Sequence, residues 1–216
     1  MSDLPGPQPW DVLTAEFLAA AADPSSLPPP ALAEIAFGGR SNVGKSSMLN
    51  MLMQRRGLVR TSSTPGATRS VNVFRAVTRN GLDLHLVDLP GYGFAKRSKA
   101  ERKQWGPLLE SYLQGRPTLR AVVVLVDARR GIEDDDLQLL EFLAAPRPGN
   151  AKLTTYVVAT KLDLIPKAKR KPTIAAIASA AGTRVIGFSA ESGEGRVDVW
   201  KAIDRLVRGP VAEATG

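Results

Sequence analysis

From residue 34 onward, short runs of apolar residues alternate with longer segments in which apolar and polar residues recur at helical spacing. Runs rich in valine and isoleucine are typical of strands, and apolar residues three or four positions apart indicate helices. Strands are therefore expected at Glu34–Gly38, Val71–Val77, Leu82–Asp88, Arg120–Asp127, Leu153–Thr160 and Arg184–Ser189. Helices are expected at Lys45–Met53, Lys99–Leu113, Asp134–Ala144, Lys171–Ala181 and Val197–Arg208.

This alternation predicts an α/β fold in which a mostly parallel sheet is covered by helices on both faces. One pair of strands departs from the pattern. Val71–Val77 and Leu82–Asp88 are joined by a short turn that contains Asn80-Gly81, a strong hairpin signal, so they are expected to be antiparallel neighbours. Ligands of such sheets bind outside the carboxyl ends of the parallel strands.

The start of the chain differs from the rest. Residues 1–33 are predicted to form an N-terminal extension, because prolines at Pro5–Pro9 and Pro28–Pro30 make both of its borders stiff. Between them, Val12–Ala22 is rich in alanine, and its local propensity predicts a helix. A single domain is expected over residues 34–209, followed by a disordered tail over residues 210–216.

The composition excludes several kinds of site. The chain has 216 residues, of which 44% are hydrophobic, and this is enough for one globular domain with a real core. It has no cysteine, which excludes disulfides, thiolate zinc sites and cysteine nucleophiles. The one histidine, His85, lies in an alternating apolar run and is most simply a residue on one face of a strand.

Charge and hydropathy indicate where the protein is located and what kind of partner it binds. The longest apolar run, Ala121–Val126, is too short to cross a bilayer, and the first residues lack the pattern of a signal peptide. We therefore expect a cytoplasmic protein without membrane insertion, and the absence of heptads favours a monomer. The net charge of +8 favours polyanions, without choosing between RNA, DNA and anionic lipid.

The most specific motif is Gly39-Arg-Ser-Asn-Val-Gly-Lys-Ser46, which matches the phosphate-binding loop G-x-x-x-x-G-K-[ST]. Its glycines let backbone N–H groups approach an anion, Lys45 supplies positive charge for the β- and γ-phosphates, and the Ser46 hydroxyl is placed to hold Mg²⁺. The alternative is a glycine-rich turn with an accidental lysine. The predicted strand before the motif and the predicted helix after it argue against that alternative.

Two further strand ends carry chemistry suited to a nucleotide. The strand that ends at Asp88 continues as Asp-Leu-Pro-Gly91, a D-x-x-G pattern. Its carboxylate can hold a metal-bound water, and the Gly91 N–H can contact a γ-phosphate. In isolation the same residues are also compatible with an ordinary turn.

The strand Leu153–Thr160 ends in Thr160-Lys-Leu-Asp163, a guanine-reading pattern. The Asp163 carboxylate can accept hydrogen bonds from the guanine N1–H and 2-amino group, which adenine lacks. The Lys161 stem can cover one face of the base. After the last strand, Phe188-Ser-Ala190 can present a backbone N–H, that of Ala190, to the guanine O6.

The polar loop Thr61–Arg69 lies between the phosphate loop and the hairpin, where a nucleotide switch would close over Mg²⁺. Thr68 is the candidate for a second metal ligand. The alternative is an ordinary polar loop in which Thr68 is solvated.

Taken together, the segments GRSNVGKSS, TSSTPGATRSVN, DLPGYGFAK, TKLD and FSA resemble the EngB/YihA/YsxC type of bacterial GTPase. The resemblance covers about residues 34–200. It implies a three-layer Ras-like P-loop GTPase fold, GTP hydrolysis, a role in assembly of the large (50S) ribosomal subunit, and a link to cell division and septation. It also implies a strand within the N-terminal extension, in conflict with the helix predicted at Val12–Ala22.

The resemblance assigns roles by position. The catalytic residues are Lys45, Thr68, Asp88 and Gly91, and Mg²⁺ is held by Ser46 and Thr68. The residues that contact GTP or GDP are Gly39, Arg40, Ser41, Asn42, Val43, Gly44, Lys45, Ser46, Ser47, Gly66, Ala67, Thr68, Arg69, Ser70, Asp88, Leu89, Pro90, Gly91, Thr160, Lys161, Leu162, Asp163, Phe188, Ser189 and Ala190.

Two residues bear on the rate of hydrolysis. Tyr92 stands where many small GTPases have a glutamine that orients the attacking water, so slow intrinsic hydrolysis is expected until a partner or an ion completes the site. Asn42 stands where related GTPases use an asparagine to bind K⁺. The alternative is that Asn42 only shapes the loop, and a comparison of hydrolysis in KCl and NaCl separates the two.

Basic clusters indicate the partner. One follows D-x-x-G inside the predicted second switch (Lys96, Arg97, Lys99, Arg102 and Lys103), and another comprises Lys167, Lys169, Arg170 and Lys171. We expect the first cluster to contact ribosomal RNA when GTP orders the switch. Two alternatives remain open, namely a regulatory GTPase at the division site with a protein partner, and a P-loop ATPase.

Overall fold

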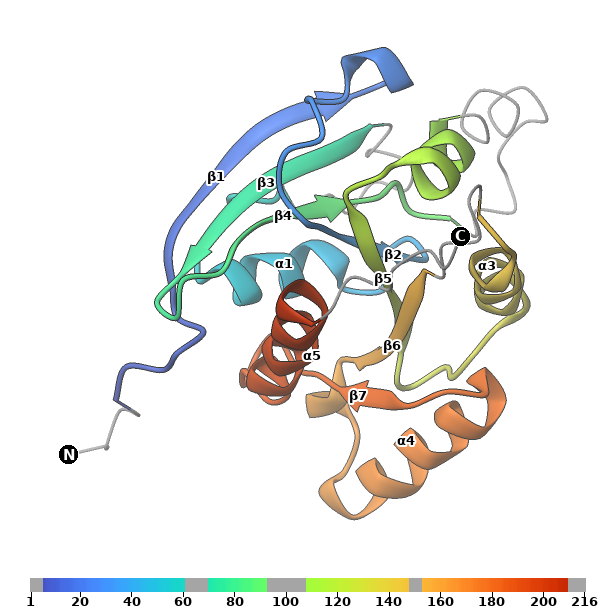
Figure 1. Ribbon diagram of the computed structural model, residues 1–216. Helices are drawn as coiled ribbons and strands as arrows, with labels where there is room; N and C mark the ends of the chain where they lie inside the picture. Colours follow the sequence, from blue (N-terminus) through green and yellow to red (C-terminus); the bar gives the residue numbers. More distant parts are fainter. Residues whose placement is uncertain (1–5, 61–69, 93–107, 148–152, 210–216) are drawn as a thin grey trace.

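The computed structural model describes residues 6–60, 70–92, 108–147 and 153–209. Within these ranges the chain forms a seven-stranded sheet with the order β1-β3-β4-β2-β5-β6-β7 (Figure 1). Its strands are β1 (Val12–Ala21), β2 (Glu34–Gly39), β3 (Val71–Thr78), β4 (Asp83–Asp88), β5 (Leu119–Asp127), β6 (Thr154–Thr160) and β7 (Val185–Gly187). β3 pairs antiparallel with both β1 and β4, and the other described pairings are parallel. The predicted hairpin is confirmed.

Helices cover both faces of this sheet (Figure 1). They are α1 (Lys45–Met53), α3 (Asp134–Ala144), α4 (Lys167–Ala181), α5 (Arg196–Arg208) and a helical segment over residues 108–115, with short 3-10 turns at Pro24–Ser26 and Leu162–Leu164. The predicted α/β fold with helices on both faces is therefore confirmed. The prediction for residues 210–216 and the part of the predicted helix before residue 108 lie outside the described residues.

The strands separate two hydrophobic cores because successive side chains point to opposite faces. On β5, Val123 and Leu125 pack in the core under α1 and α5, whereas Val122, Val124 and Val126 pack in the core under α3, α4 and residues 108–115. A strand buried on both faces reads as a continuous apolar run, and this explains the valine-rich sequence of β5.

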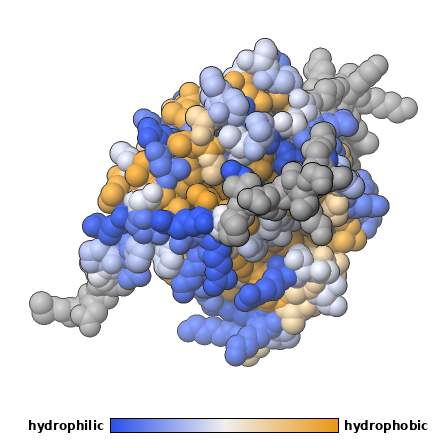
Figure 2. Space-filling view, in the orientation of Figure 1, coloured by the Kyte–Doolittle hydropathy of each residue, from blue (hydrophilic) through white to orange (hydrophobic). Residues whose placement is uncertain are grey.

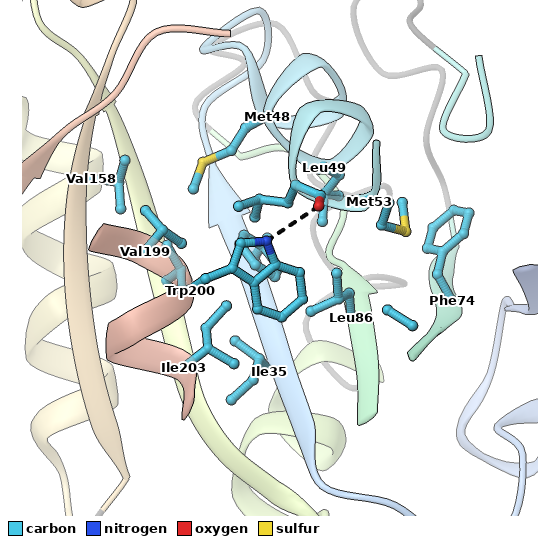
Figure 3. Close-up of a cluster of buried hydrophobic side chains, with 14 of the residues drawn as sticks. Ile35, Met48, Leu49, Met53, Phe74, Leu86, Val158, Val199, Trp200 and Ile203 are labelled. Atoms are coloured by element: carbon cyan, nitrogen blue, oxygen red, sulfur yellow. Dashed lines mark hydrogen bonds between the residues drawn. The ribbon is translucent and has the colours of Figure 1, made fainter. Parts of the chain in front are cut away.

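The largest buried side chain of the first core is Trp200 on α5, which is fully buried. Figure 3 shows its indole among side chains from both helices and from the sheet, with Met48 and Leu49 on one side and Ile203 on the other. The indole Nε1 donates a hydrogen bond to the Leu52 carbonyl at 3.2 Å. This bond fixes the C-terminal turn of α1 against α5, so the helix that begins at the phosphate loop is held rigidly at its other end.

The helix predicted at Val12–Ala22 is wrong, because this segment forms the edge strand β1. Its backbone pairs with β3 from Val12 opposite Thr78 to Ala21 opposite Val71, with irregularities near Leu13 and Leu18. Alanine favours helices only weakly, and the ladder to β3 overrides that preference. The strand implied by the family resemblance is present. Hydrophobic residues are interspersed with hydrophilic ones on the face shown in Figure 2.

Two element boundaries also differ from the prediction. α4 begins at Lys167, four residues before the predicted start, and contains Pro172 in its second turn. Proline is tolerated best in the first turn of a helix, whereas here it follows five helical residues. The last strand is shorter than predicted, since β7 comprises only Val185–Gly187.

A buried cluster of polar side chains lies at the amino end of β2, the end opposite the phosphate loop. Glu34, at the start of β2, is fully buried and accepts hydrogen bonds from Arg116 Nη2 at 2.6 Å and Tyr112 Oη at 2.8 Å. Burial alone would raise the pKa of Glu34, but the His85 imidazole, with Nδ1 3.8 Å away, and the two hydrogen-bond donors outweigh it and lower the pKa to about 2. The carboxylate therefore anchors the helical segment 108–115 to β2.

Replacing Glu34 by Gln should lower the free energy of unfolding by about 3 kcal/mol at neutral pH, because Arg116 is left buried without its carboxylate. The stabilising contribution of Glu34 is complete above its unfolded pKa of 4.5 and is lost as the pH falls toward about 2. The difference in urea unfolding between variant and wild type should therefore shrink below pH 4.5. Glu16→Gln, at an exposed position, is the matched control. Equal stability of E34Q and wild type at neutral pH would contradict this assignment.

Candidate functional site

The phosphate loop connects the end of β2 to the start of α1, as the sequence predicts. Asn42 and Gly44 adopt left-handed backbone conformations, with φ of 63° and 102°. At Gly39 a Cβ atom would lie 2.8 Å from the Val43 side chain, so only glycine fits there. These constraints turn the backbone into a tight loop at the N-terminus of α1, where N–H groups and the helix dipole favour an anion.

Lys45 and Asp88 form a buried ion pair at the centre of the site. Lys45 is the first residue of α1, and Asp88 is the last residue of β4, which runs parallel to β2. The exposed fraction is 8% for Lys45 and 2% for Asp88, so each charge depends on the other in the absence of a ligand. Asn72 Nδ2 lies 3.4 Å from the second oxygen of Asp88.

The D-x-x-G segment lies directly against the phosphate loop. The Tyr92 N–H donates to the Gly39 carbonyl at 3.3 Å, and the Ser41 N–H donates to the Tyr92 carbonyl at 3.2 Å. A Cβ atom at Gly91 would lie 3.1 Å from Ser41 Oγ, and this explains the glycine. The structure thus brings Asp88–Gly91 and the phosphate loop together.

The Tyr92 side chain turns away toward α3. Its hydroxyl donates to Asp136 Oδ1 at 2.9 Å, and Asp136 is almost fully buried. Burial raises the pKa of Tyr92, and the Asp136 carboxylate raises it further, so the phenol stays protonated. A protonated phenol that donates to Asp136 does not accept a proton from water.

The segment predicted to read guanine, Thr160–Asp163, is also attached to the phosphate loop. Thr160 Oγ1 donates to the Val43 carbonyl at 2.6 Å, and Lys161 Nζ donates to the Asn42 carbonyl at 2.6 Å. Lys161 has a left-handed backbone, with φ of 57°. These bonds join the carboxyl end of β6 to the phosphate loop across the end of β5, although 117 residues separate Thr160 from Val43.

The two segments that are predicted to contact the guanine base, Thr160–Asp163 and Phe188–Ala190, also contact each other. Ser189, fully buried, donates from Oγ to Asp163 Oδ1 at 2.6 Å. The Leu162 N–H donates to the Phe188 carbonyl at 3.1 Å, and the Phe188 N–H donates to the Ala159 carbonyl at 2.8 Å. Asp163 and the chain leading to Ala190 are therefore held in one unit at the ends of β6 and β7.

Some of the predicted site residues are brought together and others are not described. The described ones are Gly39, Arg40, Ser41, Asn42, Val43, Gly44, Lys45, Ser46, Ser47, Ser70, Asp88, Leu89, Pro90, Gly91, Thr160, Lys161, Leu162, Asp163, Phe188, Ser189 and Ala190. Gly66, Ala67, Thr68 and Arg69 lie outside the described residues, as does the basic cluster that begins at Lys96.

The sequence interpretation missed Asp127 and Arg129. Asp127 ends β5 and accepts hydrogen bonds from Arg129 and Lys161 beside a cavity of about 260 Å³ next to the phosphate loop. The signal was available, because Asp127 is an aspartate at the carboxyl end of a buried parallel strand, as Asp88 is. The sequence interpretation assigned the ends of β2, β4, β6 and β7 and left the end of β5 unassigned.

Metal binding is consistent with the donors present. Within the described ranges, no group of three His, Cys, Asp or Glu side chains is placed to hold a metal ion. Mg²⁺ in nucleotide sites is instead held by one or two protein oxygens together with phosphates and waters, so the Ser46 hydroxyl fits its predicted role as a ligand and the Asp88 carboxylate fits its predicted role as an acceptor from a metal-bound water. The left-handed backbone of Asn42 agrees with the loop-shaping alternative, and K⁺ binding stays a prediction.

None of the described helices is both long and apolar enough to span a bilayer. This finding concerns only the residues that the structure describes.

Known proteins share this sequence and fold. Residues 34–161 match the family model described as "50S ribosome-binding GTPase". The protein named "Probable GTP-binding protein EngB" of Geobacter metallireducens is 46% identical over 94% of this chain and 97% of its own length. The protein of the same name from Pelobacter propionicus is 47% identical over 91% of this chain and 95% of its own length.

Solved structures confirm the Ras-like fold. A crystal structure of a probable GTP-binding protein EngB superposes with a TM-score of 0.63 at 23% identity and covers 82% of this chain and all of its own. Era, crystallised with MgGDPNP and nucleotides of 16S ribosomal RNA, gives a TM-score of 0.68 at 23% identity and covers 83% of this chain and 58% of its own. Its phosphate loop, D-x-x-G segment and T-K-x-D segment are joined at the carboxyl ends of the strands, and by sequence the chain belongs to the EngB family of GTP-binding proteins, with a GTPase domain.

Proposed function

We propose that this protein binds GTP, hydrolyses it to GDP and phosphate, and acts as a nucleotide-dependent switch in assembly of the large ribosomal subunit, with the link to division and septation that this role implies. One observation carries the nucleotide part of the proposal. Thr160 and Lys161 attach the segment Thr160–Asp163, which we call the base-reading segment, to carbonyl groups of the phosphate loop. A purine triphosphate can therefore contact both segments at once.

Base selection is assigned to Asp163. Its Oδ1 accepts from Ser189, and its carboxylate keeps enough acceptor capacity for the guanine N1–H and 2-amino group. Adenine offers no donor at either position and would leave the carboxylate unpaired, and this disfavours the ATPase alternative. The Lys161 stem, held at its Nζ by the Asn42 carbonyl, would cover one face of the base.

Phosphate binding is assigned to Lys45 and to the N–H groups of residues 39–46. In the free protein Lys45 pairs with Asp88. When a nucleotide binds, its phosphates would replace Asp88 as the partner of Lys45. Asp88 would then be available to accept a hydrogen bond from water near the γ-phosphate. Ser46 and Thr68 are proposed to hold Mg²⁺, which neutralises charge on the β- and γ-phosphates when bound.

Slow intrinsic hydrolysis is part of the proposal. Tyr92, at the position of the water-orienting glutamine, donates its hydroxyl proton to Asp136 on α3. Within the described ranges, the ion pair of Arg40 with Glu133 also keeps that arginine occupied. A partner would therefore have to complete the site, and K⁺ at Asn42 is the second candidate for this role.

The ribosomal partner is proposed from charge. The net charge of +8 favours a polyanion, and the described basic residues include exposed Lys167, Lys169 and Lys171 on α4. Hydrophilic residues prevail at the lower edge of the face in Figure 2, where α4 lies in Figure 1. Contacts of this kind go mainly to RNA phosphates, so they would be sensitive to salt and largely independent of sequence.

Co-sedimentation with ribosomal particles tests this role. With a non-hydrolysable GTP analogue, we expect at least about fivefold more protein on large-subunit particles than with GDP, and raising the salt from about 50 to about 200 mM should release it. Lys45→Met, impaired in nucleotide binding, is the control that should lose the dependence on the analogue. Binding that ignores the nucleotide, or recovery of the locked protein with a division-site protein and no particle, would contradict the proposal.

A further inference from the structure

Asp127 lies between the phosphate loop, which follows β2, and the segment Thr160–Asp163 at the end of β6. It ends β5, the strand between β2 and β6, and is only 7% exposed. Its Oδ2 accepts from Lys161 Nζ at 2.8 Å and from Arg129 Nη2 at 2.7 Å. Its Oδ1 accepts from Arg129 Nε at 2.9 Å and from the Arg129 N–H at 3.0 Å. The carboxylate is thus held by its own loop through both oxygens and offers one of them to Lys161.

Lys161 needs such an anchor. Its backbone lies in the left-handed region, which costs a residue with a Cβ roughly 1–2 kcal/mol. Its side chain spans from β6 to the phosphate loop, and its Nζ contacts the Asn42 carbonyl and Asp127. A lysine stem has many rotamers, and ordering it costs entropy unless both ends are fixed. Asp127 supplies a charged acceptor in a partly buried place, where such a hydrogen bond is strong.

We propose that Asp127 is a positioning residue for the nucleotide. By holding Lys161 Nζ, it clamps the base-reading segment onto the phosphate loop and sets how long a guanine nucleotide stays bound. This inference rests on the proposed function, because it concerns guanine nucleotides at the same site. Asp127 touches neither base nor phosphate in this role. It acts through Lys161, and Arg129 orients its carboxylate.

The geometry separates this role from a purely structural one. Asp127 also shapes the turn after β5, where its Oδ1 accepts from the Arg129 N–H and its carbonyl accepts from the Arg130 and Gly131 N–H groups. Asp127→Asn retains an oxygen for the turn and replaces Oδ2 by an amide nitrogen, which cannot accept from Lys161. The substitution therefore removes the bonds of Oδ2 to Lys161 Nζ and Arg129 Nη2, leaves Lys161 with the Asn42 carbonyl alone, and preserves the turn made by Oδ1 and the backbone.

The first measurement is the dissociation rate of a fluorescent guanine nucleotide. Asp127→Asn should accelerate the release of GDP and of a non-hydrolysable GTP analogue by the same factor of about ten, equivalent to about 1.4 kcal/mol. Lys161→Met keeps the stem and removes Nζ, and the double variant D127N/K161M should release nucleotide no faster than K161M alone. Asp204→Asn, which removes the negative charge from an ion pair with Arg208 on α5, is the matched control and should resemble the wild type.

A second measurement does not depend on nucleotide. In the free protein, acylation of Lys161 read by mass spectrometry should rise about threefold or more in D127N, because the amine loses its charged partner. Acylation of the exposed Lys201 should not change. Wild-type release rates in D127N, unchanged labelling of Lys161, or an undiminished D127N effect in the K161M background would each overturn the proposal. Loss of the proposed function would appear differently, as a wild-type protein that does not prefer guanine nucleotides.

Discussion

Asp163→Asn is expected to exchange the base preference of the protein from guanine to xanthine. The amide can donate to the 2-oxo group of xanthine, where the carboxylate accepted from the 2-amino group of guanine. Each mismatched pairing leaves buried polar groups unpaired, so the ratio of GTP to XTP affinity should fall by about a thousandfold, or about 4 kcal/mol. Ser189 Oγ keeps an oxygen to which it can donate, so the local structure should persist.

The measurement is displacement of a fluorescent guanine nucleotide by GTP, XTP and ATP, with wild type and variant side by side. Asp198→Asn, at an exposed position in the first turn of α5, controls for the loss of one negative charge. An unchanged ratio of GTP to XTP affinity in D163N would mean that Asp163 does not contact the base.

Lys45→Met should weaken GTP binding by about a hundredfold or more, because a buried charge opposite the β- and γ-phosphates is worth about 3 kcal/mol or more. Hydrolysis should fall at least as far, since Lys45 is expected to neutralise charge in the transition state. Titration calorimetry with GTP and release of phosphate are the two measurements.

This substitution has a second effect that must be separated from the first. Without Lys45, Asp88 stays buried without its partner, so the free protein should lose roughly 3 kcal/mol of stability. The double variant Lys45→Met/Asp88→Asn removes both charges and should regain most of this stability without regaining GTP affinity. If the double variant bound GTP as well as the wild type, Lys45 would not be a phosphate ligand.

Most of the fold could be predicted from the sequence, because hydrophobic periodicity records which faces are buried. β5 and α1 are examples, since the continuous valine run and the spacing of Met48, Leu49 and Leu52 follow from the two cores. β1 could not be predicted from its own residues. Its alanines favour a helix, and only the pairing with β3, about 60 residues away in the chain, makes it a strand.

The motifs of the candidate site could be found from the sequence, but their connections could not. The pairing of Thr160 with the Val43 carbonyl, and of Tyr92 with Asp136, joins residues that no local pattern relates. The place of Asp127 at the end of a buried strand could be found from the sequence, but its contact with Lys161 could not. Its role depends on lying between Arg129 and Lys161 in space, and only the order of β5 and β6 in the sheet brings Lys161 to it.

The central claim is that separate strand ends meet around one guanine nucleotide, and the wild-type arm of the base competition tests it most directly. With Mg²⁺ present, GTP and GDP should displace the bound fluorescent nucleotide at concentrations about a hundredfold or more below that of ATP, because only guanine pairs with Asp163. Displacement by ATP and GTP at the same concentration would contradict the account.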